Sequence, residues 1–276
     1  MLRALPPQIP SREPVFNIPS VVAVTIGALV LLHALRSLLS DAADVRLLLD
    51  LAFIPARWAV AWEPAKAAEI MGAIAREGTN PETAIRLAFA RYVLGDARPP
   101  YWTVLTYALL HGSWAHILLN SVWLAAFGTP VARRCGPIRF LVLALASAMG
   151  GAVTHFLVNA TSVMPMVGAS AAVSGLMGAA TRFVFVSGAG RLGPGDWKGQ
   201  HTRPPRLSLS EVVTNSRAAL FLGAWFVTNL LFGLLATPLG ITDASIAWEA
   251  HVGGFLVGLL IFPLVDSSEP IRFHAT

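Results

Sequence analysis

Six long apolar runs constrain the fold of this chain more than any other feature. Each contains close to the roughly 20 residues that an α-helix needs to cross the hydrocarbon core of a bilayer. Together they account for more than a third of the sequence, which favours one compact bundle. We therefore predict an all-α, polytopic membrane protein with six transmembrane helices. The runs lie at residues 20–39, 113–131, 138–158, 170–186, 218–235 and 247–265.

The composition agrees with a membrane location. Hydrophobic residues make up 55% of the 276 residues and charged residues 13%, whereas an average soluble domain has about 25% charged residues. The net charge of +5 does not indicate a nucleic-acid partner, because the basic residues lie between apolar runs and are not clustered with aromatic residues. Cys135 is the single cysteine, so no intramolecular disulfide is possible.

Arginine and lysine indicate the orientation of the chain. They occur after the second and fourth apolar runs, whereas the connections after the third and fifth runs contain none. Because basic loops stay on the inner side, both termini are expected to be cytoplasmic. We expect an N-terminal segment (1–19), a retained membrane domain (20–265) with a long outer loop (40–112) and an inner loop (187–217), and a C-terminal tail (266–276). The basic residues are Arg133, Arg134, Arg191, Lys198, Arg203, Arg206 and Arg217.

The long outer loop has features of a membrane-associated segment. Asn80 is a typical N-cap followed by a proline, apolar residues then recur at helical spacing, and Gly95 ends the run. This pattern predicts an amphipathic helix lying on the membrane surface. Aromatic residues suited to a membrane interface lie in the same loop: Trp58, Trp62, Tyr101 and Trp102.

Four polar residues inside the apolar runs fall near the outer face. His116 and Asn120 lie one helical turn apart in the second run, Ser170 opens the fourth run, and His251 lies about one turn into the sixth. Polar groups in membrane helices usually face the bundle interior or a water-filled cavity. Because alternating topology puts all four at the same depth, we predict that they share one site.

These residue types suit attack by a serine on a carbonyl group. Ser170 is a candidate nucleophile, and His251 is a candidate base that takes the hydroxyl proton. His116 and Asn120, with the backbone N–H of Ser170, are candidate donors to the oxyanion that forms. Glu249 lies at a loop boundary, so a two-residue dyad is expected rather than a triad.

Small residues are placed where they allow this pair to meet. Gly168 lets the chain approach the candidate nucleophile closely. Gly253, Gly254 and Gly258 give the sixth run a face without side chains, which allows close packing of the fourth and sixth helices.

Other interpretations of the same residues remain open at this point. Each serine, asparagine or glycine alone is compatible with helix packing. A transporter would place its binding residues nearer the midplane of the membrane. A zinc site is a further alternative, but there is no HExxH motif and no carboxylate at the spacing of a metalloprotease, so no metal is expected. The histidines of that alternative are His111, His116, His155 and His251.

Three short motifs resemble the signatures of one family. "HGSWAHILLN" ending at Asn120, "GASA" around Ser170 and "AHVGG" around His251 are similar, in order and helix position, to the motifs of the rhomboid family of intramembrane serine proteases. The resemblance implies a six-helix rhomboid bundle with Ser170 as nucleophile and His251 as general base. It implies His116 and Asn120 as oxyanion-hole donors, and His111 matches a further histidine common in the family.

The resemblance also implies an activity and a location. The expected activity is an endopeptidase that cleaves transmembrane segments of other membrane proteins near the outer face, without a cofactor. The expected location is a bacterial inner membrane, where membrane-protein substrates and lipid are the partners. The alternative is a rhomboid-like protein that binds or delivers membrane clients without cutting them.

Two positions depart from the family pattern within the matching region, roughly residues 98–265. Ala171 follows the candidate nucleophile, where the family usually has glycine. Its methyl group is expected either to narrow the site or to be absorbed by a small helix movement. Ser174 replaces an aromatic residue that usually supports the catalytic histidine, so His251 needs support from water or another helix.

Overall fold

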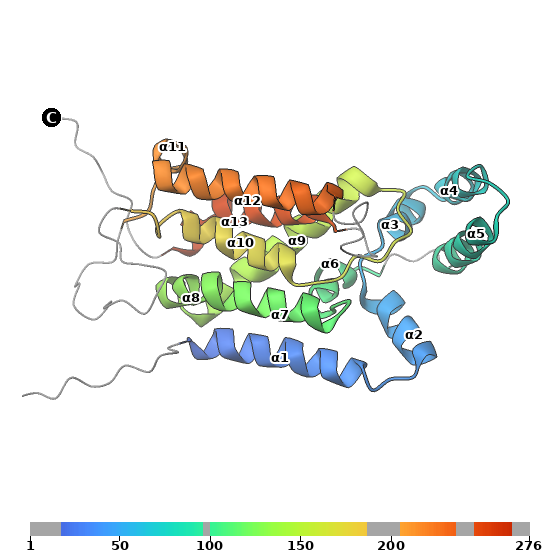
Figure 1. The fold of residues 1–276 in the computed structure, drawn as a ribbon, viewed down its shortest axis with the longest axis horizontal. Helices are drawn as coiled ribbons and strands as arrows, with labels where there is room; N and C mark the ends of the chain where they lie inside the picture. Colours follow the sequence, from blue (N-terminus) through green and yellow to red (C-terminus); the bar gives the residue numbers. More distant parts are fainter. Residues whose placement is uncertain (1–17, 96–99, 187–204, 236–245, 267–276) are drawn as a thin grey trace, which may run out of the picture.

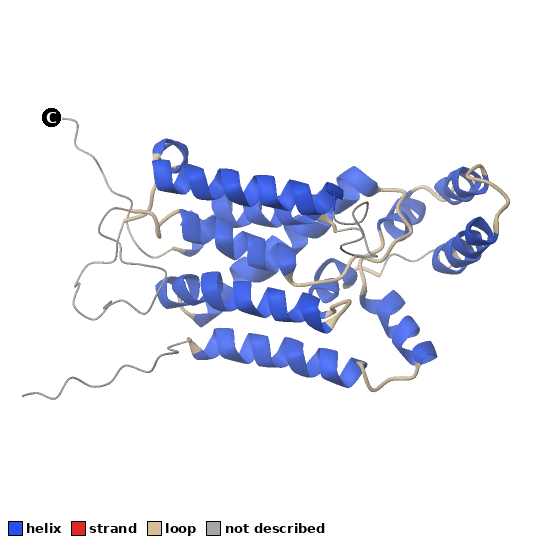
Figure 2. Cartoon of the chain, in the orientation of Figure 1, coloured by secondary structure: helices blue, strands red, loops and turns tan. Residues whose placement is uncertain are grey.

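The fold is a bundle of helices, as the apolar runs predict. A computed structural model describes residues 18–95, 100–186, 205–235 and 246–266. Within this part of the chain all regular elements are helices and there are no strands (Figure 2). The helices that run along the bundle (Figure 1) are α1 (Ser20–Arg36), α7 (Trp114–Trp123) continued through η2 (Leu124–Gly128) into α8 (Thr129–Cys135), α9 (Pro137–Asn159), α10 (Ser170–Thr181), α12 (Ser216–Leu235) and α13 (Trp248–Val265).

Four of these helices are long and apolar enough to cross a membrane, which makes this an all-α, multi-pass membrane protein. They are the continuous helix Trp114–Cys135, α9, α12 and α13. α1 is apolar but has 17 residues. α10 ends at Thr181, five residues before the predicted end of its run. Crossing by α1 and α10 therefore stays a prediction.

α10 is short because protein, and not lipid, surrounds it. All of its residues except Ser170 and Ala172 are buried, and it packs between α9 and α13. A helix enclosed in this way does not need an apolar surface as long as the bilayer is thick. The run of small residues in the sequence thus forms the centre of the bundle.

Glycines bring the backbones of α10 and α13 into direct contact. A Cβ atom added to Gly258 would lie 1.8 Å from the carbonyl oxygen of Gly175, and one added to Gly254 would lie 2.1 Å from the carbonyl oxygen of Ala171. Both distances are far below a van der Waals contact, so any side chain at these positions would push the two helices apart.

The predicted outer loop (40–112) contains more structure than the sequence indicates. Asn80 caps the predicted helix, because its side chain accepts a hydrogen bond from the N–H of Thr83 at 2.8 Å. Three further helices and a short turn of helix accompany it, and all gather at the end of the bundle where α7, α10 and α13 begin (Figure 1). The loop helices are α2 (Asp41–Leu51), α3 (Pro55–Trp62), α4 (Lys66–Ala75), α5 (Pro81–Leu94) and α6 (Thr103–Thr106).

Some predicted features fall outside the described residues. They include almost all of the N-terminal segment (1–19) and of the C-terminal tail (266–276), and the first part of the inner loop, 187–204. The boundaries of these segments stay predictions.

Because the backbones of α10 and α13 are in contact, one methyl group added between them should have a large effect on stability. Gly258→Ala should lower the free energy of unfolding by about 1–3 kcal/mol, because overpacking forces the helices apart. Gly223→Ala on α12 is the matched control, since a Cβ atom there meets nothing within 4 Å. Thermal unfolding in detergent, followed by circular dichroism, measures both variants. Equal midpoints for the two variants would contradict the assigned packing.

Candidate active site

The structure brings Ser170 and His251 together. Ser170 is the first residue of α10, and His251 lies in the first turn of α13. The Oγ atom of Ser170 is 2.8 Å from Nε2 of His251. A hydroxyl that donates a hydrogen bond to an imidazole nitrogen at this distance is the arrangement that activates a serine nucleophile.

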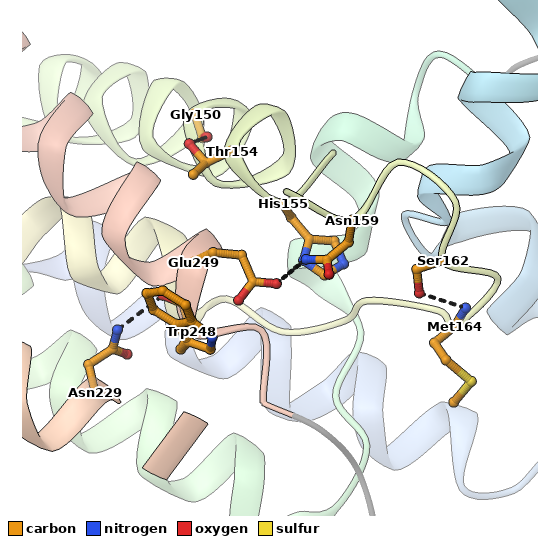
Figure 3. Close-up of polar contacts among 9 residues, drawn as sticks. All are labelled: Gly150, Thr154, His155, Asn159, Ser162, Met164, Asn229, Trp248 and Glu249. Atoms are coloured by element: carbon orange, nitrogen blue, oxygen red, sulfur yellow. Dashed lines mark hydrogen bonds and ion pairs between the residues drawn. The ribbon is translucent and has the colours of Figure 1, made fainter. Parts of the chain in front are cut away.

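The second ring nitrogen of His251 contacts a residue that the sequence analysis missed. Nδ1 of His251 is 2.6 Å from Oδ1 of Asn229, which lies on α12. Nδ2 of Asn229 donates to the backbone carbonyl of Trp248 at 3.0 Å (Figure 3). The signal that points to Asn229 is an amide in the middle of an apolar run. It provides the support from another helix that Ser174 cannot give.

Gly168 sets the approach of the chain to Ser170. Its φ of +122° is one that other residues rarely adopt. A Cβ atom there would also lie 2.8 Å from Nε2 of His116. Nδ1 of His116 accepts from the N–H of Gly112 at 3.5 Å, so Nε2 of the neutral ring carries the hydrogen. His116 therefore presents a donor beside the backbone that precedes Ser170.

Asn120 is buried, and its amide is hydrogen-bonded within its own helix. Its Nδ2 donates to the carbonyl oxygen of His116, one turn earlier in α7, at 3.0 Å. Among the described residues no hydrogen bond joins Asn120 to Ser170 or His251. The site thus places His116 close to the serine, whereas the amide of Asn120 turns back along its own helix.

His111 holds the residue that precedes the serine. It lies in the loop before α7, and its Nε2 accepts from the backbone N–H of Ala169 at 3.4 Å. Burial, with a smaller effect of nearby His116, lowers the pKa of His111 to about 3. The ring is therefore neutral at ordinary pH, and Nε2 stays able to accept this hydrogen bond.

The methyl group of Ala171 packs against a neighbouring helix. Ala171 is 1% exposed, and a Cβ atom added to Gly151 on α9 would lie 2.4 Å from the Cβ atom of Ala171. The glycine on α9 thus provides the room that the methyl group occupies. Gly151 therefore leaves space for Ala171 at the position where the family usually has glycine.

Glu249 is two residues from His251 but serves a different contact. One of its carboxylate oxygens is 2.8 Å from Nδ1 of His155 and also accepts from Nδ2 of Asn159, both on α9 (Figure 3). Glu249 and His155 are buried and Asn159 is half-buried, and together they join the end of α9 to the start of α13. Among the described residues, no three His, Cys, Asp or Glu side chains are arranged to hold a metal ion.

The fold and site define a class: a multi-pass helical membrane protein with a serine–histidine pair at one end of its bundle. Comparison with known families then identifies the family within this class. The Rhomboid domain matches residues 98–267, more than half of the chain, and the protein therefore belongs to the rhomboid family.

Similar proteins come from bacteria and plants. Rhomboid protease GluP of Bacillus subtilis (strain 168) is 36% identical over 101 residues, 37% of this chain and 19% of that protein. RHOMBOID-like protein 4 of Arabidopsis thaliana is 29% identical over 160 residues, 58% of this chain and 33% of that protein. RHOMBOID-like protein 5 of the same plant is 27% identical over 167 residues, 58% of this chain and 42% of that protein. The chain thus spans less than half the length of each of these relatives.

The packing of Ala171 predicts a loss of stability when its methyl group is removed. Ala171→Gly should destabilise the protein by about 1 kcal/mol or more, because it opens a void and places glycine in a helix. Gly151→Ala should destabilise the native protein, and it should cost less in the Ala171→Gly background, where its methyl group finds room. Unfolding midpoints of the two single variants and the double variant measure this coupling. Strictly additive effects would show that the two positions do not share one space.

Proposed function

We propose that the protein is an intramembrane serine endopeptidase that uses Ser170 and His251 as a catalytic pair. The observation that carries this proposal is the 2.8 Å contact between Oγ of Ser170 and Nε2 of His251 at the N-terminal end of a buried helix. The family and the similarity to Rhomboid protease GluP of Bacillus subtilis support a protease.

The reaction has two stages: acylation of Ser170 and hydrolysis of the acyl group. Oγ of Ser170 attacks the carbonyl carbon of the scissile peptide bond while its proton moves to Nε2 of His251. The protonated ring then gives this proton to the leaving amine, and the acyl group stays on the serine. Water, deprotonated by the same ring, then attacks the acyl carbon. The bond from this carbon to Oγ breaks, the second product leaves with a new carboxyl group, and the ring returns its proton to Oγ of Ser170.

Donors near Ser170 stabilise the oxyanion in this proposal. The N–H groups of the first turn of α10 have no acceptor within the helix, so in this proposal they are free to donate to the oxyanion. Nε2 of His116 and Oγ of Ser170 both lie beside Gly168, since a Cβ atom added there would be 2.8 Å from Nε2 and 3.7 Å from Oγ. Asn120 joins them when its amide turns away from the carbonyl of His116. Preplaced donors of this kind are among the largest contributions to acyl-transfer catalysis.

The proposed substrates are transmembrane segments of other membrane proteins, reached from the lipid. The distribution of basic residues supports an orientation with the end of the bundle that holds Ser170 on the outer face and both termini in the cytoplasm. The proposed location is a bacterial inner membrane, and residues 20–265 form the membrane domain.

The catalytic pair predicts covalent labelling of one serine. A fluorophosphonate reacts only with an activated serine, so the native protein in detergent should be labelled and should cleave a transmembrane substrate. Ser170→Ala should abolish both, and His251→Ala should slow both strongly. The double variant should be little worse than either single variant, because the two residues act as a unit. Ser174→Ala is the matched control, since it removes a buried serine one turn further along α10.

Two results would contradict the proposal. Labelling that persists in Ser170→Ala would assign the reactivity to another residue. A folded native protein that takes no label and cuts no transmembrane substrate would favour a protein that binds membrane clients without cutting them.

The proposed orientation predicts which loops an impermeant thiol reagent reaches. Thr79 lies between α4 and α5, and Ser210 lies in α11 (Leu209–Thr214); both are exposed. In sealed, right-side-out membranes Thr79→Cys should react and Ser210→Cys should not. The native protein is the control, because its single cysteine, Cys135, is buried. If the reagent reacts at position 210 and not at position 79, the orientation is the reverse of the proposed one.

A further inference from the structure

α12 carries one buried side chain with a polar group, and that group reaches the site. In its most apolar 18-residue stretch, 6% of the residues are buried inside the protein, whereas the same fraction for α13 is 44%. Its two buried residues are Ala218 and Asn229. An amide in a membrane helix is costly unless it is hydrogen-bonded. The contacts of Asn229 therefore need an explanation beyond packing.

The hydrogen bonds of Asn229 determine which nitrogen of His251 carries the proton. Because Nδ2 donates to the carbonyl of Trp248 at 3.0 Å, the oxygen of the amide faces His251. That oxygen only accepts, so Nδ1 of His251, 2.6 Å away, must be the donor. In a neutral imidazole Nε2 then has a free lone pair, and it faces the hydroxyl of Ser170 at 2.8 Å.

Packing holds the amide in this position. The ring of Trp225, one turn earlier on α12, stacks on Phe255 of α13 with centroids 4.3 Å apart. One turn after Asn229, Gly233 lies against Trp248, because a Cβ atom added there would be 2.5 Å from the Cβ atom of Trp248. The two contacts flank the amide along the helix and fix its distance from α13.

We propose that Asn229 is a positioning residue for His251: it selects the tautomer with hydrogen on Nδ1 and holds the ring toward Ser170. It keeps accepting the same hydrogen bond after the ring takes the proton of the serine. An uncharged amide does this without placing a carboxylate in a helix that faces lipid. The effect on turnover rests on the proposed function, whereas the tautomer is a property of the folded protein.

The experiment compares three variants on α12. Asn229→Leu keeps the approximate volume and removes the acceptor, Asn229→Asp keeps an acceptor oxygen, and Thr228→Val changes an exposed polar residue next to it. With a transmembrane substrate, Asn229→Leu should lower kcat by about 10- to 100-fold with little change in KM, because loss of the group that orients a catalytic histidine acts on turnover. Asn229→Asp should lose less kcat, and Thr228→Val should match the native protein.

A spectroscopic readout tests the tautomer without reference to activity. In protein with ¹⁵N-labelled histidine, the hydrogen-bonded Nδ1–H of His251 should give a downfield proton resonance, assigned by its loss in His251→Ala. The resonance should persist in Thr228→Val and Ser170→Ala and disappear in Asn229→Leu.

The outcomes separate this inference from the proposed function. A native protein that cuts no substrate but shows the Asn229-dependent resonance would overturn the protease and leave the positioning role supported. Native kcat in Asn229→Leu, or a resonance that persists in this variant, would overturn the positioning role.

Discussion

The direct backbone contact between α10 and α13 is the interaction on which the rest of the structure depends. In a bilayer, helices associate through close packing of small residues, because lipid tails are as apolar as the side chains. Gly175 and Gly258 let the two backbones touch, and Gly254 meets the carbonyl of Ala171. This approach places the N-terminal end of a short buried helix beside the first turn of α13. The serine hydroxyl and the imidazole then lie 2.8 Å apart.

Polar contacts near the site are divided between two faces of α13. One face joins Ser170, His251 and Asn229, so a row of hydrogen-bonded side chains crosses from α10 through α13 to α12. The other face joins Glu249 to His155 and the end of α9. The carboxylate of Glu249 makes its hydrogen bonds to side chains of α9 rather than to His251. It also ties the start of α13 to a second helix, which stabilises the end of the bundle where the site lies.

The sequence was sufficient to predict the features that depend on local pattern. Run lengths predicted the helices, the Asn80 cap marked a loop helix, and the depth of Ser170 and His251 in their runs placed them at one level. Features that depend on tertiary contacts were missed. Asn229 is one amide in an apolar run, and only the packing of α12 on α13 shows what it contacts. α10 ends earlier than its run because burial removes the need to span the lipid. The additional loop helices are short, and short helices depend on packing more than on propensity.

Mass spectrometry after treatment with a bifunctional reagent tests the central claim most directly. The reagent carries one group that acylates an activated serine and a second, a few bonds away, that alkylates imidazole. If the α10–α13 contact holds the two side chains within hydrogen-bonding distance, proteolytic digestion should yield one cross-linked product that contains Ser170 and His251. Gly258→Ala, which separates the helices, should yield much less of it. Serine adducts without any link to His251 in the native protein would contradict the account.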